Sequence, residues 1–268
     1  MIPVSVVIIT KNEAEIIADS IRMARLITDD IVIVDNGSTD ETLQIAIDYG
    51  CRVYQKDWDG YGANKNKGIE LARYDWILSL DADEIAGVDL VESLRRIVLD
   101  SPETVYDIKF KSYFGKKQIR FGKWGRDHHI RLFNRTMVKW SVSPVHETLM
   151  LPKQVNIKKV HGHVHHYSVN NNKECQAKAL YYAKLSAKNC YQTGQKATFV
   201  KLHISPVFNF VKNYLIFLGF LDGKEGFDIA KASIKHTYLK YRYLRKMAQV
   251  NKNKPYVRKE LIYPVFAD

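Results

Sequence analysis

Val4-Ser5-Val6-Val7-Ile8-Ile9-Thr10 is a nearly unbroken run of apolar and β-branched residues close to the start of the chain. Such a run is typical of a strand that is buried on both faces in a parallel sheet. Further strand-like runs at Ile31–Val34, Arg52–Tyr54 and Trp76–Leu80 alternate with stretches of helical spacing. The sequence therefore predicts an α/β fold with a mostly parallel, Rossmann-like sheet flanked by helices.

Polar residues at the strand ends predict where two of these helices begin. Asn12 can cap the helix that follows the first strand. Ser38 or Thr39 can cap the helix that runs through Tyr49.

The pattern changes beyond Asp81. A helix over 90–99 precedes strand-like segments at 106–114, 130–133 and 160–166, and apolar residues then recur at helical spacing from 173 to 245, with a glycine-rich break around Gly219, Gly223 and Gly226. We expect one compact body in three parts. These are two halves of an α/β domain, 1–100 and 101–170, and a helical C-terminal extension, 171–268.

Composition narrows the class of protein. The formal net charge is +12, which attracts polyanions, but no stretch of aromatic and basic residues predicts a nucleic-acid-binding platform. The three cysteines are widely spaced and form no C-x-x-C pair, which indicates reduced thiols. The first residues lack the order of a secretory signal, so we expect a cytoplasmic protein.

An acidic cluster follows the fourth strand run, in the DxD pattern Asp81-Ala82-Asp83. Residues i and i+2 of an extended chain point the same way, so both carboxylates can face one ion. Mg²⁺ and Mn²⁺ prefer such oxygen ligands, together with water and substrate phosphates. The alternative is a solvated acidic turn that caps the next helix.

Asp35 ends the second strand run at the same predicted edge of the sheet. Its carboxylate can accept a hydrogen bond from the ring N–H of uracil, or it can stabilise the Asn36-Gly37 turn. The tetrapeptide Thr10-Lys11-Asn12-Glu13 ends the first strand beside it, where it can hold a ribose and base or act as a helix cap.

Together these segments resemble the family 2 glycosyltransferases of the GT-A fold. The matching stretches are 7–13, 32–42 and 80–84, and Asn36 stands where many members carry a second aspartate. Residues 60–68 look like the family's small-residue loop, with Lys65 in place of a frequent arginine. The resemblance implies an inverting, single-displacement transferase that uses a UDP-sugar donor and Mg²⁺ or Mn²⁺, with 1–100 as the donor-binding half and 101–170 as the acceptor-binding half.

The resemblance also implies a set of donor and metal residues. Alternate histidines at 161–166 could form a metal site. Because most histidines are structural, we expect only His166 to contact a metal or the diphosphate. The expected metal ligands are Asp81, Asp83 and His166. The expected donor contacts are Thr10, Asn12, Glu13, Asp35, Gly37, Ser38, Lys65, Lys67, Asp81 and Ala82.

Residues 122–127, 130–135, 145–147 and 165–168 look like the branch that adds glucose in β-1,4 linkage to the lipopolysaccharide inner core. Glu147 is the candidate catalytic base, and otherwise a surface acid paired with Lys or Arg; Asp127 is the second candidate. The expected acceptor contacts are Trp124, Arg126, Arg131 and His146.

The expected activity is therefore transfer of a hexose, glucose from UDP-glucose, to a heptose of an anionic glycolipid. Alternatives are another acceptor, such as a capsule chain or polyprenyl phosphate, a basic nucleic-acid-binding protein, or a non-catalytic sugar-binding protein. The apolar stretch 207–218 is too short and polar to span a bilayer. It predicts either peripheral binding at the inner face of the cytoplasmic membrane or a helix packed on the catalytic body. The sequence leaves the oligomeric state open.

Overall fold

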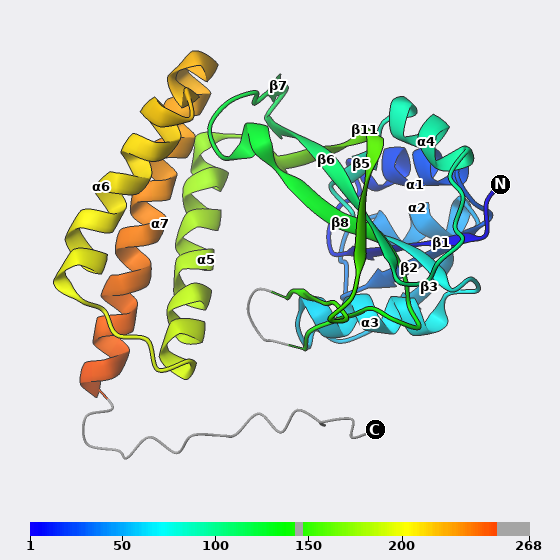
Figure 1. Ribbon diagram of the computed structural model, residues 1–268, viewed down its shortest axis with the longest axis horizontal. Helices are drawn as coiled ribbons and strands as arrows, with labels where there is room; N and C mark the ends of the chain where they lie inside the picture. Colours follow the sequence, from blue (N-terminus) through cyan, green and yellow to red (C-terminus); the bar gives the residue numbers. More distant parts are fainter. Residues whose placement is uncertain (143–146, 251–268) are drawn as a thin grey trace.

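The computed structural model describes residues 1–142 and 147–250 of the chain. Figure 1 shows an α/β body that holds the N-terminus, and beside it a bundle of helices formed by the C-terminal part. The main sheet has the strand order β3-β2-β1-β4-β8-β6-β11-β5, with β7 paired to β6. This architecture confirms the predicted α/β fold with a helical C-terminal extension. The part boundaries near 100 and 170 stay predictions.

The N-terminal half of the sheet consists of parallel strands: β1 (Val4–Thr10), β2 (Asp30–Asp35), β3 (Arg52–Gln55) and β4 (Trp76–Asp81). Every residue of β1 and β2 is buried, as their apolar runs predict. Because β1 pairs with both β2 and β4, Thr10, Asp35 and Asp81 end at the same edge of the sheet.

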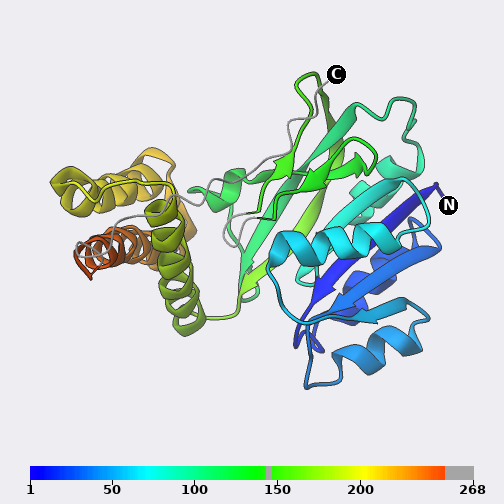
Figure 2. The same ribbon diagram turned by 90° about the horizontal axis from the view of Figure 1, so that it is seen from below.

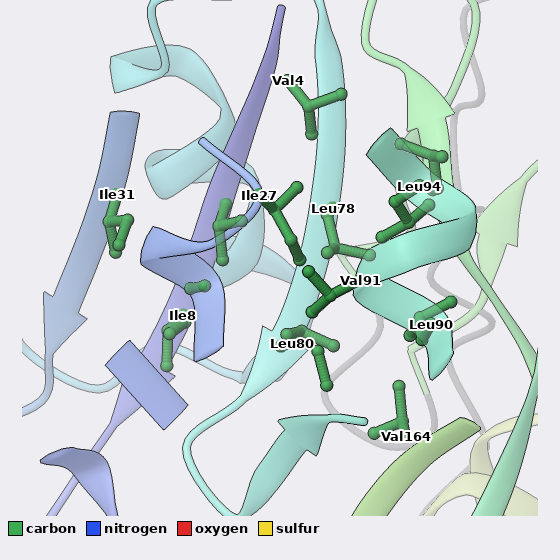
Figure 3. Packing of buried hydrophobic residues seen from close by; sticks show 14 of the residues in the cluster. Val4, Ile8, Ile27, Ile31, Leu78, Leu80, Leu90, Val91, Leu94 and Val164 are labelled. Carbon is green, nitrogen blue, oxygen red and sulfur yellow. The ribbon is translucent and has the colours of Figure 1, made fainter. Parts of the chain in front are cut away.

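Helices cover both faces of this half, as Figure 2 shows. They are α1 (Ile17–Arg25), α2 (Thr42–Asp48), α3 (Tyr61–Leu71) and α4 (Val88–Arg95). Side chains alternate along β1, so Ile8 packs in the same core cluster as α1, α2 and α4, whereas Val7 packs in the cluster that holds Ile69 of α3. Figure 3 shows the first cluster, in which Val91 of α4 lies against Leu78 of β4.

Two helix caps predicted from the sequence are wrong. Asn12 adopts a left-handed backbone with φ of 55°, and its Oδ1 accepts the backbone N–H of Thr39 at 2.8 Å. At the start of α2, Asp40 Oδ1 accepts the backbone N–H of Thr42 at 3.1 Å, a role that Ser38 or Thr39 was expected to fill. The polar loop residues after β1 and β2 therefore bond to one another and fix the two loops at the sheet edge.

The second half of the sheet is mixed. Strand β8 (His128–Asn134) is antiparallel to both β4 and β6 (Thr104–Phe114), while β11 (Asn156–Val169) is parallel to β6 and antiparallel to β5 (Glu84–Ala86). The three strand-like segments predicted beyond residue 100 are confirmed. The smaller elements are β7 (Lys117–Gln118), η1 (Trp124–Arg126), β9 (Lys139–Trp140) and β10 (Leu149–Met150).

The C-terminal part is helical, with the predicted break in its middle. Its long helix α7 packs along α5 and α6. Among the described residues no single helix is long and apolar enough to cross a membrane, although Val200–Ile216 and Gly219–Val250, bent by 71°, pass that test as a pair on length and composition. The elements are α5 (Asn172–Gln192), η2 (Val200–Ile204), α6 (Ser205–Phe210), η3 (Val211–Ile216), η4 (Gly219–Asp222) and α7 (Gly223–Val250).

Asp222 fastens this bundle to the α/β body. Its side chain is buried, and its two carboxylate oxygens accept the backbone N–H groups of Arg120 at 3.1 Å and Phe121 at 2.9 Å. Within the bundle, η4 and the start of α7 pack closely, because a Cβ at Gly226 would lie 2.0 Å from the carbonyl oxygen of Gly219. The helices α5 and α7 are thereby held opposite the sheet edge.

Candidate active site

A cleft of about 950 Å³ opens at the carboxyl ends of β1 and β4. Residues of α5 and α7 form its outer wall, so it lies between the α/β body and the helical bundle (Figure 1). In open α/β sheets, ligands bind at this edge. The predicted site residues that line the cleft are Thr10, Glu13, Asp81, Ala82, Asp83, Trp124, Asp127, Arg131 and His166.

A second cavity of about 830 Å³ lies next to Asp81. Lys65 and Glu147 line this cavity, together with Trp140. Asp81 and Arg131 line both spaces, so the two spaces adjoin at the end of β4.

Asp81 ends β4 between two cations. Its Oδ1 lies 3.0 Å from Lys65 Nζ, and its Oδ2 lies 3.4 Å from Arg131 Nη2. Burial alone would raise the pKa of Asp81, but the charges of Lys65 and Arg131 hold that pKa below its usual range. The group is therefore a carboxylate at neutral pH.

Lys65 is a buried cation shared by two acids. Its side chain is 2% exposed, and its Nζ lies 3.0 Å from Glu147 Oε1 as well as 3.0 Å from Asp81. The ammonium group also lies 4.5 Å from the ring centroid of Trp140, a cation–π contact. Glu147 is thus paired with a lysine, as the non-catalytic interpretation predicts, but at the candidate site instead of on the open surface.

Arg131 forms a second ion pair beneath Asp81. Its guanidinium donates to Glu84, which is 2% exposed and whose Oε2 accepts the backbone N–H of Asp81 at 3.0 Å. Burial raises the pKa of Glu84, while the charge of Arg131 opposes that rise. Arg131 was expected to contact the acceptor; the structure engages its guanidinium with protein carboxylates that position the end of β4.

Asp83 lies beside His166 on the same cleft wall. Asp83 Oδ2 and His166 Nε2 are 3.5 Å apart. Burial lowers the pKa of a histidine, yet the hydrogen bond and charge of Asp83 and the charges of Glu84 and Asp81 raise the pKa of His166 above its ordinary value. The structure therefore brings together the three residues predicted as metal ligands.

These residues fit a divalent cation that shares its ligands with a substrate. Asp81 Oδ1 is buried beside Lys65 Nζ, 3.0 Å away, and accepts no well-oriented hydrogen bond from the described residues. Among those same residues, no group of three His, Cys, Asp or Glu side chains is arranged to hold a metal by itself. Mg²⁺ and Mn²⁺ are commonly bound by one or two carboxylates plus water and substrate phosphates, which matches this open arrangement.

Asp35 is buried at the end of β2 and does not line the cleft. Its Oδ2 accepts the backbone N–H groups of Gly37 and Ser38, both at 3.0 Å, and its Oδ1 accepts the Ser38 hydroxyl. Ser38 in turn accepts the backbone N–H of Asn12 at 2.9 Å. These four predicted donor residues thus form one hydrogen-bonded loop next to the cleft, as the turn-stabilising interpretation predicts.

Glu13, a predicted donor contact, contributes a titratable group to the cleft. Burial and the nearby charge of Asp83 raise the pKa of Glu13 to about 7. Its backbone N–H donates to the Thr42 hydroxyl at 2.8 Å. By contrast, Lys67 lies on the outside of α3, where it pairs with Glu70 at 3.4 Å.

The remaining predicted residues divide between the cleft and its surroundings. Asp127 and Trp124 line the cleft, and burial raises the pKa of Asp127 above its usual value. Arg126 is exposed, with its guanidinium 4.5 Å from the ring centroid of Phe217. His146 lies outside the described residues.

Several site residues were missed by sequence reasoning. Glu84 lies in the matching stretch 80–84, but nothing in that stretch indicates that Glu84 is buried. Trp140 follows the core position Val138, a weak signal that the aromatic ring is buried. Tyr61 and Tyr182 meet across the cleft, and their separation along the chain gives no sign of it.

Comparisons with known proteins agree with this geometry. The model of glycosyl transferase family 2 matches residues 5–161, and the chain belongs to that family. An uncharacterized glycosyltransferase of Rickettsia prowazekii is 30% identical over 84% of this chain and 80% of its own length. The lipopolysaccharide core biosynthesis glycosyltransferase LpsC of Rhizobium meliloti is 28% identical over 80% of this chain and 81% of its own. The protein is thus a glycosyltransferase.

Among solved structures, glucosyl-3-phosphoglycerate synthase from Mycobacterium tuberculosis, in complex with Mn²⁺, UDP and glucosyl-3-phosphoglycerate, is similar over a part of the chain. It is 24% identical, covers 41% of this chain and 44% of its own, and has a TM-score of 0.35.

Proposed function

We propose that this glycosyltransferase moves glucose from UDP-glucose to a heptose hydroxyl of an anionic, lipid-linked core oligosaccharide. The observation that carries the proposal is the placement of Asp81 and Asp83 beside Thr10 and Glu13 in one cleft at the sheet edge. Two carboxylates at that position suit a cation that binds a diphosphate.

A divalent metal would be held by Asp81 and Asp83, with His166 beside them. When bound, it would neutralise charge on the departing diphosphate. The chain's own groups keep the ligands ready: Lys65 and Arg131 keep Asp81 ionised, and the buried pair of Arg131 with Glu84 fixes the end of β4. These preorganised charges cost no rearrangement during reaction.

Glu147 is the proposed base that takes the proton of the acceptor hydroxyl. Its ion pair with Lys65 orients the carboxylate 3.0 Å from the same ammonium group that contacts Asp81. Asp127 is the second candidate, because it lines the main cleft and its pKa is raised by burial, which makes it a stronger base. A direct displacement needs only one of them and no covalent nucleophile.

The acceptor class is supported by the likeness to LpsC and by charge. Residues 196–250 contain ten basic and three acidic residues, which favours an anionic acceptor and an anionic surface. Another acceptor, such as a capsule chain or polyprenyl phosphate, is the alternative within the same family.

The helical bundle further supports peripheral binding to the inner face of the cytoplasmic membrane. Large apolar side chains are exposed along η2, α6, η3 and η4, which we call the apolar edge: Phe199, Val200, Ile204, Val207, Phe208, Leu215, Ile216, Leu218, Phe220 and Leu221. An exposed apolar surface flanked by lysines is typical of proteins that lie on anionic bilayers.

The test is to incubate the purified protein with UDP-glucose, other UDP-sugars and GDP-sugars, with Mn²⁺ or Mg²⁺, and to measure the nucleotide released. We expect UDP release from UDP-glucose, increased by a heptose-terminated lipid-linked core oligosaccharide. Asp83→Ala should abolish that release, whereas Asp48→Ala, an exposed acid on α2, should leave it unchanged. Wild-type release from Asp83→Ala would remove the metal assignment.

A further inference from the structure

Four aromatic side chains line one stretch of the cleft. Trp58 and Tyr61 come from the α/β body, and Tyr181 and Tyr182 come from α5. Trp58 and Tyr61 meet edge to face with ring centroids 4.6 Å apart, and the two tyrosines of α5 meet with centroids 5.4 Å apart. Trp58 is 46% exposed, Tyr181 48% and Tyr182 38%, so core packing does not account for these three rings, whereas Tyr61 packs against a core cluster.

The two pairs join across the cleft. The hydroxyls of Tyr61 on α3 and Tyr182 on α5 lie close enough to influence each other's pKa. Burial raises the pKa of both hydroxyls, so each stays neutral and can donate as well as accept. Tyr182 is close enough to Asp81 for that charge to act on its hydroxyl, which places the aromatic group beside the reaction centre.

We propose that Trp58, Tyr61, Tyr181 and Tyr182 form an acceptor platform that binds the sugar ring receiving the glycosyl group. The inference rests on the proposed function. A pyranose ring presents an apolar C–H face that stacks on an aromatic ring, while its hydroxyls can bond to tyrosine hydroxyls. The platform supplies both kinds of contact within the same cleft as Asp81.

The acceptor is assigned to this platform because of where its parts lie in the chain. The donor-side residues on β1 and β4 fall within 5–161, the segment that matches the family model, whereas α5 begins at Asn172. A wall outside the shared segment suits the substrate that differs between members of a family. Tyr181 and Tyr182 thus place half of the platform outside the shared segment, whereas Trp58 and Tyr61 lie within it.

Two lysines on the same walls indicate the charge of this acceptor. Lys123 and Lys178 both line the cleft. Lys178 is held in place by the Ser168 carbonyl oxygen at 2.5 Å and by Glu174 at 3.1 Å. A sugar that carries a phosphate or carboxylate would be favoured over a neutral one.

The experiment compares Trp58→Ala, Tyr181→Ala and Tyr182→Ala with Tyr238→Ala, a matched control on α7 that is 39% exposed and lies outside the cleft lining. Binding of a detergent-solubilised, heptose-terminated lipid-linked core oligosaccharide is measured by calorimetry without donor, and KM is measured for both substrates. We expect the Kd and KM for the oligosaccharide to rise about five- to tenfold in the three platform variants, with the KM for UDP-glucose within about twofold. Tyr182→Phe keeps the ring and should show the smaller loss.

Unchanged Kd for the oligosaccharide in all three platform variants would overturn the inference, as would a rise confined to the KM for UDP-glucose. The proposed function fails separately, if the wild type binds the oligosaccharide but releases no UDP from UDP-glucose. If the wild type turns over and the variants bind the oligosaccharide normally, the proposed function is supported and the platform inference is wrong.

Discussion

The Nζ atom of Lys65 lies 3.0 Å from Oε1 of Glu147, although the two residues are 82 positions apart in the chain. The same nitrogen lies 3.0 Å from Asp81 Oδ1. The candidate base and a candidate metal ligand are therefore coupled through one buried cation. A change at any of the three alters the charge balance of the other two.

Replacing the proposed base tests the first consequence. Glu147→Gln keeps the shape of the side chain but cannot take a proton, so we expect kcat for transfer to fall by about 100-fold or more. The KM for UDP-glucose should change little, because the proposed donor contacts lie mainly at the ends of β1 and β4. Asp127→Asn is the comparison. Loss of transfer in that variant, with Glu147→Gln still active, would assign the base to Asp127.

Lys65 should matter for stability as well as for chemistry. Lys65→Met keeps the length of the side chain but leaves Asp81 and Glu147 without their shared cation. Because breaking a buried ion pair from one side is costly, we expect a loss of about 3–5 kcal/mol in the free energy of unfolding, measured in urea. Lys67→Met, on the exposed side of the same helix, should change it by less than about 0.5 kcal/mol. Equal losses in the two variants would contradict the structure.

Much of the fold could be predicted because it follows local patterns. The apolar runs of β1, β2 and β4 indicate strands buried on both faces, and the DxD pattern at Asp81 marks a strand end. Asn12 shows the limit of such patterns. A polar residue after a strand can cap a helix or bond to a neighbouring loop, and here the loop contact with Thr39 is the one formed.

The position of the candidate site at the sheet edge was predictable, but its supporting contacts were not. Asp81, Asp83 and His166 line one cleft, and their role as metal ligands stays a prediction, whereas the ion pair of Arg131 with Glu84 depends on β8 lying beside β4, a pairing between distant segments. A basic residue such as Arg131 looks the same in the sequence whether its side chain faces a cleft or pairs with a buried carboxylate. Tyr182 lines the cleft because α5 packs opposite the sheet edge. No local sequence pattern predicts that packing.

Asp30 should make stability depend on pH. Its buried carboxylate accepts hydrogen bonds from the Ser5 hydroxyl at 2.5 Å, the backbone N–H of Arg73 at 2.7 Å and the Arg52 guanidinium at 2.9 Å. Burial acts to raise the pKa of Asp30, but these hydrogen bonds together lower it. A lowered pKa in the folded state stabilises the protein above the unfolded pKa, near 3.8, and this contribution is lost as the pH falls through the folded value.

We therefore expect Asp30→Asn to lower the free energy of unfolding by about 1–3 kcal/mol at pH 7. The difference from the wild type should shrink as the pH falls below about 4, measured by urea unfolding at a series of pH values. Asp29→Asn, at an exposed neighbouring acid, serves as the control. A difference that stays constant down to pH 3 would contradict the hydrogen-bonded carboxylate.

The apolar edge of the helical bundle predicts binding to an anionic bilayer. Phe208 and Ile216 are 56% and 58% exposed, and Lys201 and Lys212 lie on the neighbouring segments η2 and η3. The double variant Phe208→Ser and Ile216→Ser removes apolar area without changing charge, so it should weaken binding to vesicles that contain phosphatidylglycerol by about tenfold.

The measurement is co-sedimentation with vesicles at low and high salt. We expect weaker binding to pure phosphatidylcholine and at high salt, because the lysines contribute through the surface potential. Val98→Ser removes a side chain that is 71% exposed on the α/β body, and it should bind like the wild type. If the double variant sediments with anionic vesicles as well as the wild type does, the apolar edge does not contact the bilayer. If binding persists in high salt and is lost only in the double variant, apolar insertion outweighs charge in holding the enzyme at the membrane.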